Sequence, residues 1–146
     1  MQTFLPHSCF KQTSKVLDRM RLGKQRVESK QLLTALLTGP VVVVNGVAKK
    51  TPWYNHPATK MWKGYESALC EYSIQICLEW RSRGYKDSLL PFFEERLSPN
   101  TTYPSWLGGE EFHLSHRSNL LRKLPSHYGQ FWSVDPGLPY IWPTTE

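Results

Sequence analysis

The residues best suited to chemistry lie in one short stretch, residues 21–28, which read RLGKQRVE. Lys24 and Glu28 are four residues apart, so a helix would place an amine and a carboxylate on the same face. Such a pair is either a helix salt bridge, which contributes about 0.3–0.5 kcal/mol, or an acid/base group beside an amine nucleophile. A helix break at Gly23 would also bring backbone amides and cations together, and that arrangement binds phosphates.

This stretch is the centre of a basic segment. The chain has 146 residues, with 18 Lys and Arg, 12 Asp and Glu, and a net charge of +6. Five of these six net charges lie between Lys11 and Lys30, and the usual partner of such a segment is a polyanion. The alternative is a solvated helix face. Aromatic residues make up 13% of the chain, and they suit either base stacking or an ordinary core.

Several classes of protein are disfavoured by what the sequence lacks. No apolar run approaches the ~20 residues of a membrane span, and no signal peptide precedes the first element. The three cysteines form no CxxC pair, so we expect a soluble protein of the reducing cytosol. His113 and His116 do not complete a zinc-binding pattern, and no nucleotide-binding or serine hydrolase motif is present. We therefore expect no metal and no cofactor.

Three helices must position the basic stretch. The periodicity of apolar residues predicts an all-α single domain over residues 1–146, with main helices at about 14–38, 58–83 and 110–124. Thr13 or Ser14 would cap the first helix, and Gly23 would kink it. Its expected buried stripe is Val16, Leu17, Met20, Val27, Leu33, Leu36 and Leu37.

Shorter signals complete this picture. Four consecutive valines followed by Asn45-Gly46 predict a small hairpin at 41–48. Residues 85–109 are rich in proline and predict an irregular segment, with a short helix around Pro91–Leu97. The tail should wrap the surface through its aromatic and aliphatic residues, Tyr140, Ile141 and Trp142.

Ordered motifs over nearly the whole chain resemble the pyrimidine dimer DNA glycosylase family, which includes bacteriophage endonuclease V, and in particular its bacterial and phage branch. The motifs are MQTFLP at 1–6, LDRMRLGKQRVE at 17–28, NHPA at 55–58, MW at 61–62, GYE at 64–66, RG at 83–84, HRSNLLRK at 116–123 and PYIWP at 139–143. The resemblance implies a compact all-α fold with the N-terminus at the DNA surface. The implied partner is duplex DNA that carries a damaged or modified base.

The resemblance also implies a mechanism. In the phage prototype of this family the N-terminal α-amine attacks the sugar C1′, forms an imine with the sugar and expels the base, and β-elimination then cuts the strand. A glutamate assists, and arginines hold the flanking phosphates. Arg26 matches one of these arginines, and Arg21 or Leu22 falls at the position of another. The glutamate of the phage prototype, three residues before Arg26-Val27, falls on Gly23, so Glu28 is the nearest acid.

Two amines are candidates for the nucleophile. The phage prototype loses its initiator Met and presents a small Thr, but Gln2 is large, so we expect Met1 to remain and to supply the amine. Lys24 is the alternative. We favour Met1, because α-amines ordinarily titrate ~2–3 pH units below lysine and are more often neutral at pH 7. The amine should then lie within one side chain's reach of Glu28 and Arg26, in a cleft open to solvent.

A set of polar and basic residues around these groups is expected to contact DNA. The set consists of Arg21, Gln25, His56, His116, Arg117, Arg122 and Lys123. For His56 a capping or packing role is equally compatible with the sequence, and Arg122 and Lys123 could simply stabilise a helix C-terminus. Two alternatives to an enzyme stay open at this stage: a DNA-binding module of the same fold without catalysis, and a protein whose basic helix is only a solvated surface.

Overall fold

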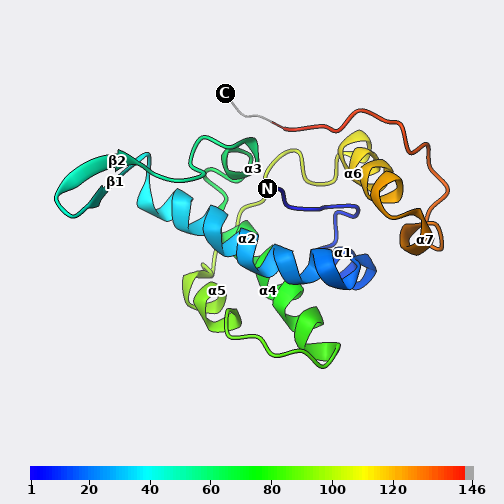
Figure 1. Cartoon of the computed structure of the whole chain (residues 1–146), viewed down its shortest axis with the longest axis horizontal. Coiled ribbons are helices and arrows are strands. Elements are labelled where there is room, and N and C mark those ends of the chain that lie inside the picture. Colours follow the sequence, from blue (N-terminus) through cyan, green and yellow to red (C-terminus); the bar gives the residue numbers. More distant parts are fainter. Residues whose placement is uncertain (144–146) are drawn as a thin grey trace.

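The computed structural model describes residues 1–143 of the chain. This part contains seven helices and one small antiparallel hairpin (Figure 1). The all-α class and the hairpin are therefore as the sequence predicts. In chain order the elements are α1 (Phe10–Val16), α2 (Arg19–Thr38), β1 (Val41–Val44), β2 (Val47–Lys50), α3 (Pro57–Lys60), α4 (Glu66–Ser82), α5 (Leu90–Arg96), α6 (Glu110–Lys123) and α7 (Pro125–Tyr128).

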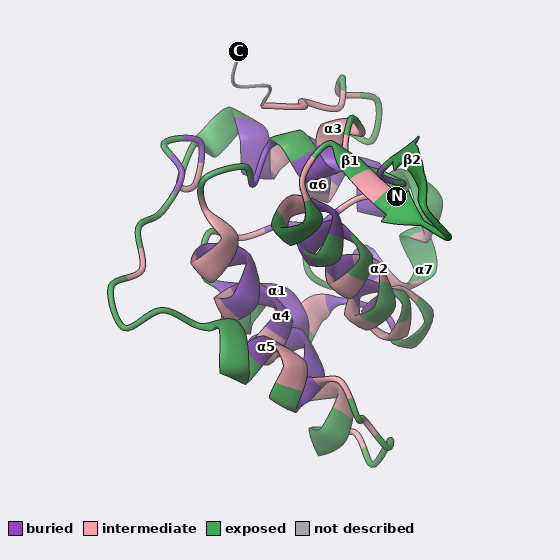
Figure 2. Ribbon diagram, turned by 90° about the vertical axis from the view of Figure 1, so that its left-hand side faces the viewer, coloured by how far each residue is buried: buried purple, intermediate pink, exposed green. Residues whose placement is uncertain are grey.

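The core lies where α2 and α4 pack against each other, and the extended N-terminal segment, residues 1–9, runs through it. Phe4 and Leu5 of this segment are buried, at 5% and 0% exposure. Trp62 is the largest fully buried side chain, and its indole donates a hydrogen bond to the Thr3 hydroxyl at 3.0 Å. The start of the chain is therefore part of the hydrophobic core, which fixes its path (Figure 2).

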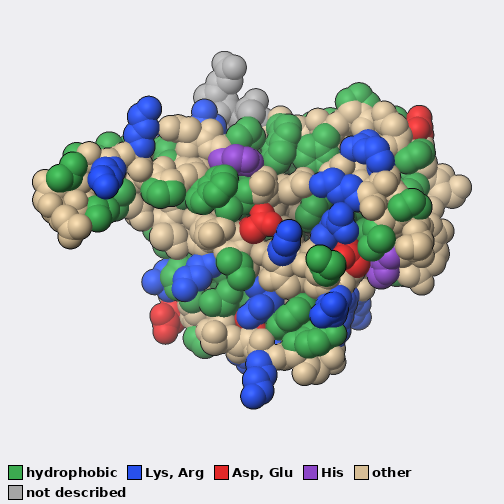
Figure 3. Space-filling view, viewed as in Figure 1, with side chains coloured by type: hydrophobic (Ala, Val, Ile, Leu, Met, Phe, Trp, Pro, Cys, Tyr) green, Lys and Arg blue, Asp and Glu red, His purple; other side chains and the backbone are tan. Residues whose placement is uncertain are grey.

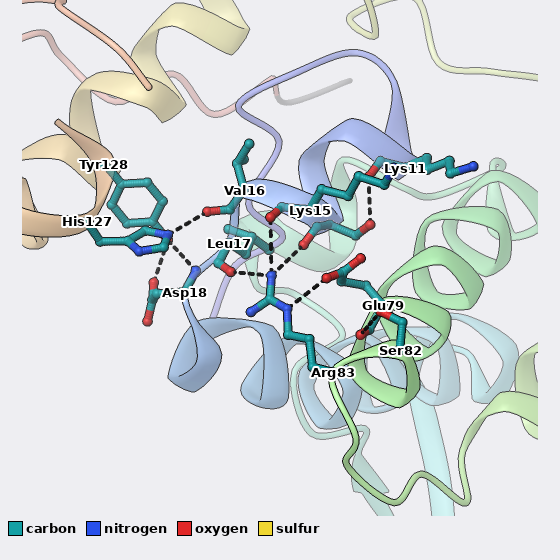
Figure 4. Close-up of polar contacts among 11 residues, drawn as sticks. Lys11, Lys15, Val16, Leu17, Asp18, Glu79, Ser82, Arg83, His127 and Tyr128 are labelled. Carbon is teal, nitrogen blue, oxygen red and sulfur yellow. Dashed lines mark hydrogen bonds and ion pairs between the residues drawn. The ribbon is translucent and has the colours of Figure 1, made fainter. Parts of the chain in front are cut away.

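The first long helix is interrupted at Leu17-Asp18, and not at Gly23 as the sequence suggested (Figure 4). Arg83 Nη2 donates to the carbonyls of Ser14, Lys15 and Leu17, so it satisfies the free C-terminal end of α1. Asp18 then caps α2 by accepting the Arg21 N–H at 3.3 Å. The expected caps Thr13 and Ser14 lie inside α1 instead.

Gly23 lies within an unbroken α2, where it allows close packing. A Cβ at this position would lie 2.9 Å from Cη2 of Trp80 on α4. The face of α2 that is buried also differs from the expected stripe. Met20 and Val27 are exposed, at 66% and 49%. The buried residues of α2 are Leu22, Gln25, Ser29, Leu32, Leu33 and Ala35.

The second long helix begins at Glu66, because a turn at Gly64, with φ of +87°, separates it from α3. The expected helix at 58–83 is thus two helices. The short helix of the proline-rich segment is present as α5, and the helix expected at 110–124 is present as α6. In the tail, Ile141 and Trp142 pack against the core as expected.

The hairpin has the geometry that its Asn-Gly turn predicts. Asn45 and Gly46 both have positive φ, +52° and +75°, as a type I′ turn requires. The register pairs Val41 with Lys50 and Val44 with Val47. Nearly every residue of the hairpin is exposed and only Val42 is half-buried, so the hairpin extends from the end of α2 with little contact with the body (Figure 2).

The three cysteines are free thiols in two different environments. Cys70 and Cys77 lie on the buried side of α4, and burial raises the pKa of their thiols to about 11 and about 12. Cys9 is exposed, directly before α1. Buried protonated thiols are poor nucleophiles, so the two on α4 are packing residues.

Neither a helix able to cross a membrane nor a cluster of three potential metal ligands occurs within residues 1–143. His113, one of the paired histidines of α6, makes backbone contacts instead. Its Nδ1 lies 2.7 Å from the Leu5 carbonyl, and its Nε2 accepts the Gly108 N–H at 2.9 Å. These contacts attach the N-terminal segment and the preceding loop to α6.

Candidate functional site

Gln25 holds the N-terminal segment against α2. Its Oε1 accepts the Phe4 N–H at 3.0 Å and the Tyr72 hydroxyl at 2.6 Å, while its Nε2 donates to the Gln2 carbonyl at 2.9 Å. The side chain is fully buried. The expectation that Gln25 contacts DNA is therefore wrong. The residue instead fixes the position of the first residues of the chain.

Two residues of α6 hold the same segment from its other side. His116 Nδ1 accepts the Leu5 N–H at 2.9 Å, and Arg117 Nη1 donates to the Pro6 carbonyl at 2.7 Å. His116 is 1% exposed, and burial lowers its pKa to about 3, so it is a neutral ring inside the protein. The expectation that His116 contacts DNA is also wrong. Arg117 is half-buried, and this hydrogen bond gives its guanidinium a structural role.

The anchored segment brings the N-terminus to Glu28 of α2. Glu28 Oε2 accepts the N–H of Gln2 at 3.3 Å. Gln2 directly follows the residue that carries the amine, so a carboxylate and an amine share one site. Met1, Gln2 and Glu28 are all half-buried, which leaves the site partly open to solvent.

His56 lies at the same site. It caps α3, with Nδ1 accepting the Ala58 N–H at 3.0 Å, so we assign the ring proton to Nε2. Its ring makes edge contacts with Trp53 and Trp142, at 5.8 and 6.0 Å between centroids. Burial lowers the pKa of His56, the positive N-terminus lowers it further, and the negative charge of Glu28 opposes both. Both charges are therefore close enough to act on the ring.

Basic side chains of α2 and α6 surround this acid. We call Arg21, Lys24, Arg122 and Lys123 the basic face. Lys123 lies 5.6 Å from the Phe4 ring. Burial lowers the pKa of Lys123. The positive charges of Arg21, Arg122 and Lys24 lower this pKa further, and the negative charge of Glu28 raises it. The charges are therefore close neighbours. On the face shown in Figure 3, Lys and Arg side chains gather between α6 and the first half of α2.

Arg26 does not reach the site, contrary to the expectation from the sequence. Positions 24 and 28 each lie about 200° around the helix from position 26. Arg26 therefore points to the opposite side of α2, where it binds Asp87 at 2.6 Å and lies 5.1 Å from the Trp80 ring. Its side chain is only 14% exposed. It stabilises the contact between α2 and the loop before α5.

A groove of about 560 Å³ lies beside this site. Its walls come from α2, from the hairpin at Val42 and from the loop at Thr51 and Trp53. Val27, adjacent to Glu28 in the sequence, contributes to its lining. Trp53 could not be selected for the site from the sequence, because an isolated tryptophan in a loop has no periodicity or motif that distinguishes it from a core residue.

The arrangement has the parts that amine chemistry on a nucleic acid needs: an N-terminal amine, an adjacent carboxylate, a neutral imidazole and four flanking cations. Comparison with known families matches residues 1–90 to the family described as pyrimidine dimer DNA glycosylase. Searches of curated proteins and of solved structures find no significant match. The matched region includes Met1, Glu28 and His56, and the chain belongs to the pyrimidine dimer DNA glycosylase family.

Proposed function

We propose that this protein is a DNA glycosylase with an associated AP lyase step, acting on a damaged or modified base in duplex DNA. By family, the substrate is of the pyrimidine dimer type. The observation that supports the proposal is the contact between Glu28 and the Gln2 N–H, because Gln2 directly follows the residue with the N-terminal amine and a carboxylate there could act as its acid/base group. Membership in the family adds the class of reaction.

The proposed reaction begins when the neutral amine of Met1 attacks C1′ of the damaged nucleotide. The C1′–N bond breaks, and its electron pair leaves with the base. Glu28 accepts the proton that the amine loses, and opening of the sugar ring gives an imine. Loss of a C2′ proton then breaks the bond between C3′ and the phosphate oxygen, which cuts the strand.

Lys24 remains the alternative nucleophile. It is exposed, and it shares a face of α2 with Glu28. No ion pair joins Lys24 to Glu28 within the described part of the chain, so the simple helix salt bridge is not formed. An amine that is free of its neighbouring carboxylate could reach a sugar. Identifying the residue that carries the adduct decides between the two amines.

Borohydride trapping on abasic duplex DNA tests the proposal. We expect a covalent adduct whose peptide maps to residue 1, and strand cleavage when borohydride is absent. Glu28→Gln keeps the acceptor for the Gln2 N–H but cannot take a proton, so it should bind DNA normally and form the adduct at least ten-fold more slowly. A duplex series carrying a cyclobutane dimer, an oxidised base or another modified base identifies the lesion. An adduct on Lys24 would reverse the assignment.

A DNA-binding module without catalysis is the second candidate. It is favoured by Gly23, which stands where the phage prototype of the family carries its glutamate and which packs against Trp80 on the side of α2 away from Glu28. Binding that depends on salt, with no adduct and no cleavage on any of these duplexes, would support this second function over the first.

A further inference from the structure

We propose that the hairpin of β1 and β2 is a DNA-binding arm, which lies along the duplex beside the damaged base. This inference rests on the proposed function, because it extends the DNA surface beyond the basic face. Lys49 and Lys50 would bind backbone phosphates, and the valines would contact sugars and base edges in a groove. None of these residues belongs to the site described above.

The first argument is the exposure of the valines. Val41, Val43, Val44 and Val47 are 55%, 67%, 43% and 55% exposed. An isolated two-stranded hairpin is marginally stable in water, and clustered exposed apolar side chains mark an interaction site. β-branched residues keep the strands extended, and the type I′ turn at Asn45-Gly46 fixes their twist. The hairpin therefore has the features of an arm that is prepared for a partner.

The register gives the arm two mixed faces. Residues paired across an antiparallel ladder share a face, so Lys50 lies beside Val41, and Lys49 lies beside Val42. Val42 also lines the groove against α2, which attaches the base of the arm to the body. Each face thus joins an apolar surface to one cation, a combination suited to a sugar–phosphate backbone and its groove.

Charge selects DNA as the partner. Residues 29–65 contain no Asp or Glu, and their charged residues are all lysines: Lys30, Lys49, Lys50, Lys60 and Lys63. A second copy of the hairpin would bring like charges together, whereas a polyanion neutralises them. The arm is therefore electrostatically suited to the same partner as the basic face.

The position of the arm agrees with this partner. α2 carries Arg21 and Lys24 of the basic face on its first half, and the hairpin follows its other end (Figure 1). In Figure 2, turned by 90°, the hairpin and the N-terminus lie on the same side of the molecule. Four residues of strand span about 13 Å, which corresponds to about four base pairs. The arm can therefore follow the duplex away from the reacting sugar.

Trp53 connects the arm to the site. Its φ of +69° is unusual for a bulky residue, and its carbonyl is held by the Thr59 hydroxyl at 2.7 Å and the His56 N–H at 3.1 Å. The ring remains 46% exposed beside His56. The strained backbone thus keeps an aromatic surface between the arm and His56, where it could stack on a base or a sugar.

The test measures binding to abasic duplexes with long flanks and with either flank shortened to about four base pairs. We expect the wild-type protein to lose affinity when one particular flank is shortened, and Lys49→Gln/Lys50→Gln to be insensitive to that change. This double variant should also lower the slope of log K against log salt by about 1.8, for two phosphate contacts. Val43→Thr/Val44→Thr keeps the β-branched shape and should weaken binding several-fold with the slope unchanged.

Lys11→Gln/Lys15→Gln is the matched control, because it removes the same charge from exposed positions of α1. It should retain the sensitivity to flank length. Hairpin variants that match the wild-type protein in affinity, slope and flank dependence would overturn the arm while leaving the proposed function intact. The DNA-binding arm would also be overturned if the only effect of the hairpin variants were a loss of self-association or a loss of binding to anionic phospholipid vesicles. A wild-type protein that binds no DNA would overturn both.

Discussion

Arg26 and Asp87 form a buried ion pair between residues 61 positions apart in the sequence. The guanidinium lies 2.6 Å from a carboxylate that is fully inaccessible to solvent. Burial would raise the pKa of Asp87, but hydrogen bonds from Arg26 and from backbone N–H groups outweigh it and lower the pKa. The arginine that the sequence assigned to the active site thus stabilises the fold.

Arg26→Ala should therefore reduce stability rather than DNA binding. Removing Arg26 takes away the closer ion pair of a buried carboxylate and leaves only the 3.5 Å pair with Arg81, so we expect the free energy of unfolding to fall by about 2–4 kcal/mol. Urea denaturation measures this change. Arg81→Ala is the control. Arg81 is 44% exposed and lies 3.5 Å from the same carboxylate, a longer distance than that of Arg26, so its replacement should cost less than about 1 kcal/mol. Equal losses in the two variants would contradict this role for Arg26.

The triple variant Arg21→Gln/Lys24→Gln/Lys123→Gln should weaken DNA binding without unfolding the protein. These side chains are exposed or half-buried, and none is a core residue. Each lost phosphate contact should lower the slope of log K against log salt by about 0.9, so the triple variant should lower it by up to about 2.7. Fluorescence anisotropy over a range of salt concentrations measures the slope. A slope unchanged from the wild-type value would remove the basic face from the binding surface.

Gly23→Ala should destabilise the protein, although alanine is the better helix former by about 1 kcal/mol. The new Cβ would meet the Trp80 ring at 2.9 Å. That ring is held by stacking on Tyr85 at 4.3 Å and by a hydrogen bond to the Lys86 carbonyl, so it cannot move freely. Overpacking of this kind costs about 1–3 kcal/mol. In a Trp80→Leu background the same substitution should become neutral or stabilising, and urea midpoints distinguish the two cases.

His116 should make stability depend on pH. Its pKa is about 3 in the folded protein against 6.5 for an ordinary histidine, so the unfolded chain binds more protons between these values. The free energy of unfolding should therefore be highest above pH 6.5. It should decrease as the pH is lowered below 6.5, by up to about 1.4 kcal/mol per pH unit. Burial also lowers the pKa of His7, His56 and His113, which act in the same direction.

His116→Asn isolates this contribution. An asparagine oxygen can replace Nδ1 as the acceptor for the Leu5 N–H, but it does not titrate. We expect the variant to show a shallower dependence of unfolding free energy on pH between about 6.5 and 4.5, whatever its absolute stability. Asp18, whose pKa is also lowered, would act only near and below its ordinary value of 3.8. An unchanged slope would mean that His116 is accessible to protons in the native state.

Local patterns predicted the hairpin and the long helices, but not where the first helix is interrupted. The end of α1 depends on Arg83, which reaches its carbonyls from the far end of α4. Aspartate is a common helix cap, but the apolar residues on both sides of Asp18 continue a helical period. The interruption is a tertiary effect, and a single sequence carries no signal for it.

The candidate site was also predictable only in part, because some of its residues follow a local pattern and others depend on tertiary contacts. Glu28 and Lys24 could be selected because they lie on one helix face within a basic segment. The buried role of Gln25 was hidden, because polar residues inside the core break the apolar periodicity that marks a buried stripe. Gln25 and Ser29 do follow Leu22 at helical spacing, and the burial of Gln25 is explained by the N-terminal segment, to which it is hydrogen-bonded.

The contrast between the three thiols makes the protein suitable for site-selective labelling without mutagenesis. A maleimide should react with exposed Cys9 and leave buried Cys70 and Cys77 unmodified while the protein is folded. Cys9 is the last residue of the N-terminal segment that Gln25, His116 and Arg117 hold in place. A fluorophore at this position would therefore report in real time on whether the amine-bearing end of the chain stays docked when the protein meets its target.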